Sequence, residues 1–188
     1  MPTLPARFIE PMLLRQMARL REGAQWLYEL KLDGYRAIAF KSGGKVRLRS
    51  RNDKDFTARY PLIAEALSAL PDDTVIDGEV VALVKSLSAV LGTARYEPVS
   101  APALGRRCDV FDVLILAGRE VMHEPLSVRR ELLQREIMPK LREPVRESNE
   151  IGKPSFNLLQ NDGSRAPPRT WLITTTPAFE RVRQGPGH

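Results

Sequence analysis

The stretch YELKLDGYR at residues 28–36 places a lysine in an apolar-rich segment, with a carboxylate two residues away on either side. Alternate residues of a strand share a face, so Glu29, Lys31 and Asp33 are expected on one face and an apolar stripe on the other. Charged outward faces of antiparallel strands are usually only solvated. Whether Lys31 is a reactive group or a surface residue therefore depends on the rest of the chain.

The patterns around this stretch predict an α+β fold, with mostly antiparallel sheets and flanking helices. Residues that alternate between apolar and polar predict strands at 26–32, 35–40, 45–51, 74–83 and 108–116. Apolar residues at helical spacing predict helices at about 12–21, 59–70 and 127–141. Ser127 is the expected N-cap of the last helix, because its hydroxyl can accept a hydrogen bond from the first helical turn.

Two of the other expected strands carry charge on the face opposite their apolar residues. The strand at 45–51 would present a row of arginines, and the strand at 74–83 a pair of acids, Asp77 and Glu79. Arginine pairs with phosphate oxygens through a planar fork of donors. Carboxylates hold Mg²⁺, which usually also contacts substrate phosphates. Together the charged faces would suit a phosphate-rich ligand with a divalent metal, although each face taken alone is also explained as solvated surface.

The composition favours a soluble protein with a polyanionic partner. The formal net charge is +6 and the pI is about 9.8, which points to nucleic acid, nucleotide or an acidic surface. Cys108 is the single cysteine, so an internal disulfide is excluded and a reducing compartment is expected. No apolar run approaches the roughly 20 residues of a membrane span, and the first residues lack a signal-peptide core. We therefore expect a cytoplasmic protein.

Five motifs in this chain, in the expected order, resemble those of the covalent nucleotidyltransferases, which comprise ATP-dependent DNA ligases, RNA ligases and messenger-RNA capping enzymes. The matching segments are KLDGYR at 31–36, SRND at 50–53, VIDGEVV at 75–81, VFDVL at 110–114 and PLSVRRELL at 125–133. The segments WLYELKLDGYRA at 26–37 and FIEPML at 8–13 further resemble the ATP-dependent ligases of bacterial DNA end joining. The resemblance covers about residues 6 to 141.

The resemblance implies an ATP-grasp-like nucleotidyltransferase adenylation domain with ATP and Mg²⁺ as cofactors. Lys31 would attack the α-phosphate of ATP, expel pyrophosphate and carry AMP as a phosphoramidate, so that one hard phosphoryl transfer is split into easier ones. The roles that the family assigns to other residues follow. Arg36 and Arg51 contact the nucleotide, Glu79 lies near the ribose or the metal, Phe111 stacks on adenine, Asp33 shapes the lysine's surroundings and Glu29 lines the pocket wall.

The resemblance also implies a DNA substrate. AMP would pass to the 5′-phosphate of nicked or broken double-stranded DNA, and the 3′-hydroxyl would then seal the strand in repair or recombination. The residues expected to contact DNA phosphates are Arg47, Arg49, Arg129 and Arg130. A Ku-type end-joining protein is a possible partner by the same resemblance, no membrane is involved, and the expected location is the cytoplasm, in association with the nucleoid.

The sequence departs from the family on its C-terminal side. The E-G-x-x-x-K and K-x-K motifs are absent, and EIGKPSFNLLQNDGS at 150–164 resembles a segment that the family places before F-D-x-L. We expect a partial adenylation domain at 6–141, followed at 142–188 by a flexible, basic, proline-containing tail. This organisation indicates a truncated or rearranged ligase, and the loss of preorganised charge would make it a poor or inactive one.

Two other functions remain open at this point. The chain could be a non-catalytic remnant of a ligase that binds nucleic acid through phosphate contacts alone. It could also be an RNA ligase or a capping-type nucleotidyltransferase, which shares the K-x-D-G chemistry with different partners or with GTP. Covalent labelling by ATP separates the first alternative from a ligase, and nucleotide preference separates the second.

Overall fold

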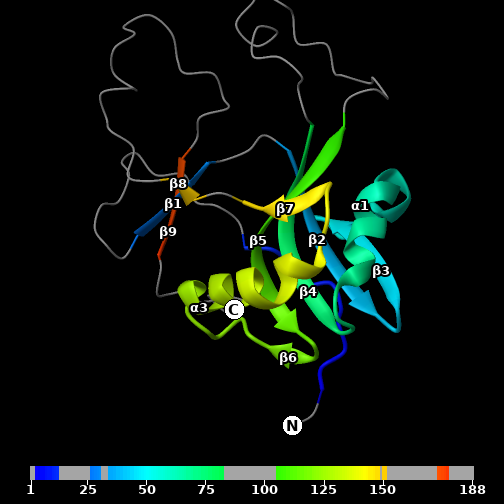
Figure 1. Ribbon diagram of the computed structural model, residues 1–188, viewed down its shortest axis with the longest axis horizontal. Coiled ribbons are helices and arrows are strands. Elements are labelled where there is room, and N and C mark those ends of the chain that lie inside the picture. The colour runs from blue at the N-terminus through cyan, green and yellow to red at the C-terminus, as the bar shows by residue number, and fades with distance from the viewer. Residues whose placement is uncertain are drawn as a thin grey trace, which may run out of the picture.

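The computed structural model describes residues 3–12, 26–30, 34–82, 105–148, 150–151 and 173–177 (Figure 1). The larger sheet is built from β2 (Tyr35–Ser42), β3 (Lys45–Ser50), β4 (Thr74–Ala82), β5 (Arg106–Leu116), β6 (Arg119–Glu120) and β7 (Val145–Glu147). Its order is β3-β2-β4-β5-β6, and β7 pairs with β5. The β5–β7 pair is parallel, and the other pairs of this sheet are antiparallel.

A second sheet joins segments that lie far apart in the sequence. It has the order β8-β1-β9, made of β1 (Trp26–Leu30), β8 (Glu150–Ile151) and β9 (Ile173–Pro177). Both pairings of β1 are antiparallel, with Tyr28 opposite Ile151 on one side and opposite Thr175 on the other. The expected α+β class with mostly antiparallel sheets is confirmed by these two sheets.

Two helical segments flank the larger sheet. The first consists of α1 (Pro61–Ala66) between two 3₁₀ turns, Thr57–Arg59 and Leu67–Ala69. The second is α3 (Leu126–Leu132), which continues as a π turn (Leu133–Ile137) and a 3₁₀ turn (Met138–Lys140). They correspond to the predicted helices at 59–70 and 127–141. The predicted helix at 12–21 lies outside the described residues, apart from Met12.

The predicted N-cap is wrong, because Ser127 lies inside the helix. The helix begins at Leu126 and Pro125 occupies the N-cap position, where no side chain caps the first turn. Proline presets the φ of the chain at this point and removes one of the N–H groups that would otherwise need a partner. The segment therefore starts without the hydroxyl cap that its sequence suggested.

The expected flexible tail at 142–188 contains part of the larger sheet. Within it, β7 runs parallel to β5, with Cys108 opposite Val145 and Asp109 opposite Arg146. Val145 is buried in the main core, and the Ser148 N–H donates to the Val110 carbonyl at 2.8 Å. A three-residue strand has too little periodicity to be predicted, yet it satisfies backbone groups along β5. Strands β8 and β9 also fall in this region, and its remaining residues after Ser148 lie outside the described ones.

The two faces of the larger sheet bury different clusters. On one face Ala39, Ile76 and Val113 pack with side chains of the two helical segments, such as Ile63 and Leu133, and Figure 1 shows α1 and α3 on the same side of the sheet. On the opposite face, Ile38, Phe40, Val75, Leu114 and Ile115 pack with Ala6 and Ile9 of the N-terminal segment. The second cluster covers only part of its face, and the motif residues of β2, β4 and β5 occupy the rest.

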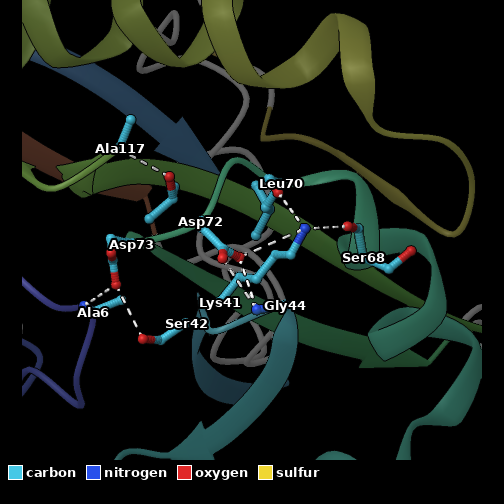
Figure 2. Close-up of polar contacts among 10 residues, drawn as sticks. Ala6, Lys41, Ser42, Gly44, Ser68, Leu70, Asp72, Asp73 and Ala117 are labelled. Carbon is cyan, nitrogen blue, oxygen red and sulfur yellow. Dashed lines mark hydrogen bonds and ion pairs between the residues drawn. The ribbon is translucent and has the colours of Figure 1, made fainter.

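The turn Asp72–Asp73 connects the N-terminal segment, the β2–β3 hairpin and the β5–β6 turn (Figure 2). The Asp73 carboxylate accepts from the Ala6 N–H and from the Ser42 hydroxyl, both at 3.0 Å. Its backbone carbonyl accepts from the Gly118 N–H at 2.8 Å. Asp72 accepts from the Gly44 N–H at 3.0 Å. This turn therefore joins the β2–β3 and β5–β6 turns at one end of the sheet. It also holds the N-terminal segment where that segment packs on the second face.

Lys41 extends across this turn and contacts the segment that follows α1 (Figure 2). Its Nζ donates to the carbonyls of Ser68 and Leu70, both at 2.9 Å, and lies 3.8 Å from the Asp72 carboxylate. Its charge thus caps two carbonyls at the C-terminal end of this helical segment, where a cation is favoured. None of the helices in the part of the chain that the structure describes could span a lipid bilayer.

Candidate functional site

Gly34 connects the lysine motif to β4. Its backbone N–H donates to Glu79 Oε1 at 2.8 Å. A Cβ added at Gly34 would lie 2.5 Å from the Val80 carbonyl oxygen and 2.9 Å from the Glu79 Cγ. A side chain is therefore excluded here by close backbone approach, and this close approach is what brings the start of β2 against Glu79.

Arg36 and Asp77 form a two-point ion pair between β2 and β4. The Arg36 Nε and Nη2 atoms each lie 2.6 Å from a different carboxylate oxygen of Asp77. The guanidinium also stacks on the ring of Phe111, 4.5 Å from its centroid. Asp77 is 1% exposed and Arg36 side chain 20% exposed, so the pair is largely desolvated and holds a fixed orientation.

The predicted site residues Arg36, Glu79 and Phe111 are thus brought together on one face of β2, β4 and β5. Arg36 lies directly opposite Glu79 in the β2–β4 register. Phe111 follows Val110, which belongs to the main core on the other face, and its contact with Arg36 places its ring on the side of Asp77 and Glu79. The alternative explanation, in which the acidic face of β4 is only solvated surface, does not apply to Asp77, because Arg36 neutralises and covers it.

Gly78, between Asp77 and Glu79, allows β5 to approach β4. A Cβ at this position would lie 2.7 Å from the Asp109 carbonyl oxygen and 3.3 Å from the Cys108 Sγ. The β4–β5 register shifts between Asp77 and Gly78, so a bulge occurs at the same place. Bulges re-aim side chains and are frequent beside active sites. Glycine is therefore required at this position of the D-G-E motif because a side chain would not fit against β5. The bulge at the same place sets the direction of the neighbouring carboxylates.

Sequence reasoning missed a group of three charged residues beside Glu79. Asp109, directly opposite Glu79, is 2% exposed and accepts from Arg107 Nε at 2.6 Å and Nη2 at 2.9 Å. Arg146 of β7 donates from Nε to the same carboxylate at 3.0 Å. The alternation of Arg107, Asp109 and Phe111 in β5 could have indicated a shared face, but no sequence signal placed Arg146 there.

The arginines of β3 lie on the same face of the sheet as the ion pair. Arg47 is opposite Phe40 and Arg49 opposite Ile38, and both partners belong to the cluster on that face. Arg47 and Arg51 are exposed. Arg49 is half-buried and donates from Nη1 to the Asp53 carbonyl at 3.1 Å. The geometry leaves Arg47 and Arg51 accessible to a ligand and gives Arg49 a partner in its own turn.

The expected DNA contacts of Arg129 and Arg130 do not hold, because both side chains are buried. Arg129 donates from Nε to Asp112 Oδ1 at 2.8 Å and from Nη2 to Oδ2 at 3.2 Å. Its Nη1 donates to the Glu124 carbonyl at 2.5 Å. Arg130 Nη1 donates to the Ser148 carbonyl at 3.3 Å and lies 3.6 Å from Glu147. These two arginines fasten α3 to β5 and β7 and do not face solvent.

The remaining predicted site residues are not placed by the structure. Lys31 and Asp33 lie outside the described residues, and Glu29 belongs to β1, of which the backbone pairing is described. The described residues contain no group of three or more His, Cys, Asp or Glu side chains that could hold a metal ion. Glu79 is the single predicted metal ligand among them, and its Oε1 accepts from Gly34.

The electrostatics of this region also affect the single cysteine. Burial raises the pKa of the Cys108 thiol to about 12, and the charges of Asp109, Asp77 and Glu79 act in the same direction. Cys108 packs in the main core, on the face opposite the carboxylates. The thiol therefore stays protonated, and Cys108 serves packing rather than chemistry.

Comparisons with known proteins identify the family of this site. Residues 11–154 match the model of the ATP dependent DNA ligase domain. DNA ligase C1 of Mycolicibacterium smegmatis is 34% identical over 143 residues, which are 66% of this chain and 40% of that protein. The multifunctional non-homologous end joining DNA repair protein LigD of Mycobacterium tuberculosis (strain H37Rv) is 35% identical over 116 residues, 60% of this chain and 15% of that protein. The chain thus spans well under two thirds of these relatives.

A solved structure agrees with the observed fold. The ligase domain of M. tuberculosis LigD superposes with a TM-score of 0.58 at 27% identity and covers 84% of this chain and 50% of that one. A mycobacterial DNA ligase D complexed with ATP and MES superposes with a TM-score of 0.59 at 24% identity, over 95% of this chain and 55% of that one. At 24% identity, the similarity to the ATP-bound ligase D shows a shared fold and nothing further.

Proposed function

Because this chain belongs to the family of ATP-dependent DNA ligase domains, we propose that it is an adenylation domain in which Lys31 accepts AMP from ATP. The observation that carries the proposal is that five residues from three motifs are joined by contacts between β2, the residue before it, β4 and β5. Gly34 donates to Glu79, and Arg36 is held by Asp77 while it stacks on Phe111. The sequence motifs are thus backed by contacts between strands as well as by their order.

In the proposed reaction the Lys31 amine, once deprotonated, attacks the α-phosphorus of ATP. The new bond is Nζ–P, the bond to the β-phosphate oxygen breaks, and pyrophosphate carries away the electron pair. The short link between Gly34 and Glu79 ties the segment that follows Lys31 to the sheet, so that the nucleophile enters a preformed site. Phe111 would stack on the adenine base. The desolvated Arg36–Asp77 pair holds the guanidinium that packs against the Phe111 ring, so the ring stays in one position.

Mg²⁺ would neutralise triphosphate charge when bound. Magnesium is commonly held by one or two carboxylates together with substrate phosphates and water. Of the described residues we assign Glu79 to this role, because Asp77 is occupied by Arg36 and Asp109 by two arginines. A single protein carboxylate of this kind fits a metal that arrives with the nucleotide.

The DNA substrate, a nick or a broken end, belongs to the same proposal. Arg47 is exposed on the face that carries Arg36 and the acids, and Arg51 is exposed in the turn that follows β3. Exposed arginines at the edge of such a face suit phosphate contacts. The relative named LigD is described as a non-homologous end joining repair protein. We extend that role to this chain, with a Ku-type partner and action in the cytoplasm at the nucleoid.

The test mixes the purified chain with Mg²⁺ and ATP labelled on the α-phosphate. We expect weak covalent label on the wild type, as the absent family motifs imply, and none on Lys31→Ala. Lys45→Ala should label like the wild type, because Lys45 is an exposed lysine at the β2–β3 turn. Ligation of a nicked duplex is then measured for the same three proteins.

Absence of label from a folded wild type would contradict the proposal. If such a protein still bound DNA, the nucleic-acid-binding remnant would be the better description. Labelling by GTP in preference to ATP would instead favour a capping-type enzyme.

A further inference from the structure

We infer that Arg107 and Arg146, held together by Asp109, form a phosphate-binding subsite beside Glu79. The inference rests on the proposed function, because it names a further ligand contact of the same sheet face. The two arginines come from different strands, β5 and β7, and share one carboxylate, with Arg107 Nε at 2.6 Å and Arg146 Nε at 3.0 Å from Asp109 Oδ1.

The charge of this group exceeds what the carboxylate needs. Asp109 is 2% exposed, and a buried carboxylate requires a paired cation. Arg107 already supplies two hydrogen bonds to it, at 2.6 and 2.9 Å. Arg146 adds a second positive charge, so the trio carries a net charge of +1 at neutral pH. A surplus guanidinium is not required for the stability of Asp109, and an anion would satisfy it.

The remaining donors face outward. Arg146 is bonded through Nε, and the described residues offer no hydrogen-bond partner to its two terminal nitrogens. Its side chain is 44% exposed, whereas that of Arg107 is 15% exposed. An anchored guanidinium loses less rotamer entropy on binding than a mobile surface one. Arg146 therefore presents a prepositioned pair of N–H donors of the kind that phosphate oxygens accept.

The location links this pair to the nucleotide chemistry. Asp109 and Glu79 are directly opposite in the β4–β5 register, which puts their Cβ atoms about 5 Å apart. Val145, the residue before Arg146, is buried in the core on the other face, so Arg146 faces the side of the site. The phosphate that reaches this subsite comes either from the triphosphate of ATP or from the backbone of the DNA.

Equilibrium binding separates these two sources and does not depend on catalysis. Isothermal titration with ATP and with inorganic pyrophosphate measures the nucleotide arm. Fluorescence anisotropy with a labelled nicked duplex, at several salt concentrations, measures the DNA arm. The variants are Arg146→Ala, which leaves the Arg107–Asp109 pair intact, Arg146→Lys, which keeps the charge, and the control Arg119→Ala, an exposed arginine on β6.

We expect Arg146→Ala to weaken one of the two ligands about tenfold, the effect of losing a charge-assisted contact, with Arg146→Lys in between and Arg119→Ala unchanged. Weaker binding of ATP and pyrophosphate assigns the subsite to the triphosphate. Weaker DNA binding, with a salt slope reduced by about one, assigns it to a DNA phosphate. Binding of both ligands within about twofold of the Arg119→Ala control would overturn the inference, since the charge-assisted contact would be missing.

The proposed function fails separately. If the wild type is not labelled covalently, adenylation is contradicted, and the binding measurements on the Arg146 variants can still be interpreted. Conversely, a wild type that labels normally, with an Arg146→Ala variant that binds both ligands like the control, would retain the adenylation domain and remove the subsite.

Discussion

The Arg36 side chain of β2 reaches diagonally to Asp77 of β4, two residues from its opposite partner Glu79, and donates two hydrogen bonds of 2.6 Å to the Asp77 carboxylate. Each residue belongs to a different sequence motif, K-x-D-G-x-R for Arg36 and D-G-E for Asp77. The pair thus connects the two motifs physically, because the carboxylate of one motif holds the guanidinium of the other, which stacks on Phe111.

Removal of the carboxylate should destabilise the protein strongly. Asp77→Ala would leave the mostly buried Arg36 guanidinium without its main partner, and breaking a buried pair typically costs about 3–5 kcal/mol of unfolding free energy. Urea denaturation followed by circular dichroism measures this change. The exposed surface pair Arg142–Glu65 offers a control, because Glu65→Ala should change stability by less than about 1 kcal/mol. Equal losses at both sites would contradict the assigned role.

Gly34→Ala should abolish covalent labelling by ATP. The new Cβ would collide with the Val80 carbonyl oxygen at 2.5 Å, so the backbone would move away from β4 and the Gly34–Glu79 hydrogen bond would be lost. Gly44→Ala is the matched control: its φ of +74° makes alanine costly by about 1 kcal/mol, yet nothing lies within 4 Å of the added Cβ. The control should label normally, and a normally labelling Gly34→Ala would refute this account of the motif.

Asp73→Ala should detach the N-terminal segment from the second face of the sheet. The change removes the acceptor of Ala6 and Ser42 and places alanine at a φ of +51°. We expect a loss of about 1–3 kcal/mol in unfolding free energy from the two unsatisfied donors. Asp73→Asn keeps one acceptor oxygen and tolerates the positive φ, so its loss should be smaller. Limited proteolysis near residues 3–12 reports the detachment. Equal losses of unfolding free energy in both variants would contradict the role of the Asp73 side chain in holding this segment.

Cys108 should make stability depend on alkaline pH. Its folded pKa of about 12 lies above the ordinary 9.0, so the unfolded chain releases its proton first. The stability contribution is therefore complete below about pH 9 and is lost as pH rises toward about pH 12. Urea midpoints measured from pH 8 to 10.5 should fall more steeply for the wild type than for Cys108→Ala, and the native thiol should resist alkylation at pH 8. Rapid native alkylation would contradict its burial.

Arg129 and Arg47 should respond to alanine substitution in opposite ways. Arg129→Ala would leave the fully buried Asp112 carboxylate without this partner, with an expected loss of about 3–5 kcal/mol in unfolding free energy. Arg47→Ala, at an exposed position, should leave stability unchanged and weaken binding to a nicked duplex. Thermal unfolding and DNA anisotropy of both variants test the pair. A stable Arg129→Ala protein with weakened DNA binding would restore the original expectation for this residue.

The strands were the most predictable part of the fold. β2, β3, β4 and β5 lie where alternating residues predicted them, because a strand of six to eleven residues carries several repeats of its period. β7 could not be predicted, since three residues hold little periodicity and its pairing with β5 depends on a distant segment. The helix at 127–141 was predicted, but its first residue and its cap were not, because Pro125 rather than Ser127 occupies the N-cap position and the helix begins at Leu126.

The candidate site was predicted unevenly for a related reason. Motif spacing selected Arg36, Glu79 and Phe111, and the structure brings these three to one face. The same spacing assigned Arg129 and Arg130 to DNA, although both are buried. A run of adjacent arginines on a helix does not reveal which of them points to the sheet, because the buried partner of Arg129, Asp112, lies 17 residues away in the chain.

By itself the sequence determined the family, the class of fold and the motif residues of the site, because these depend on local pattern and on the order of short segments. The tertiary structure decided which charges are available. It pairs Asp77 with Arg36 and Asp112 with Arg129, and it gathers Arg107 and Arg146 on Asp109. Those pairings connect different strands or helices, and the free energy of a charge is set by its burial and its partners rather than by its neighbours in sequence.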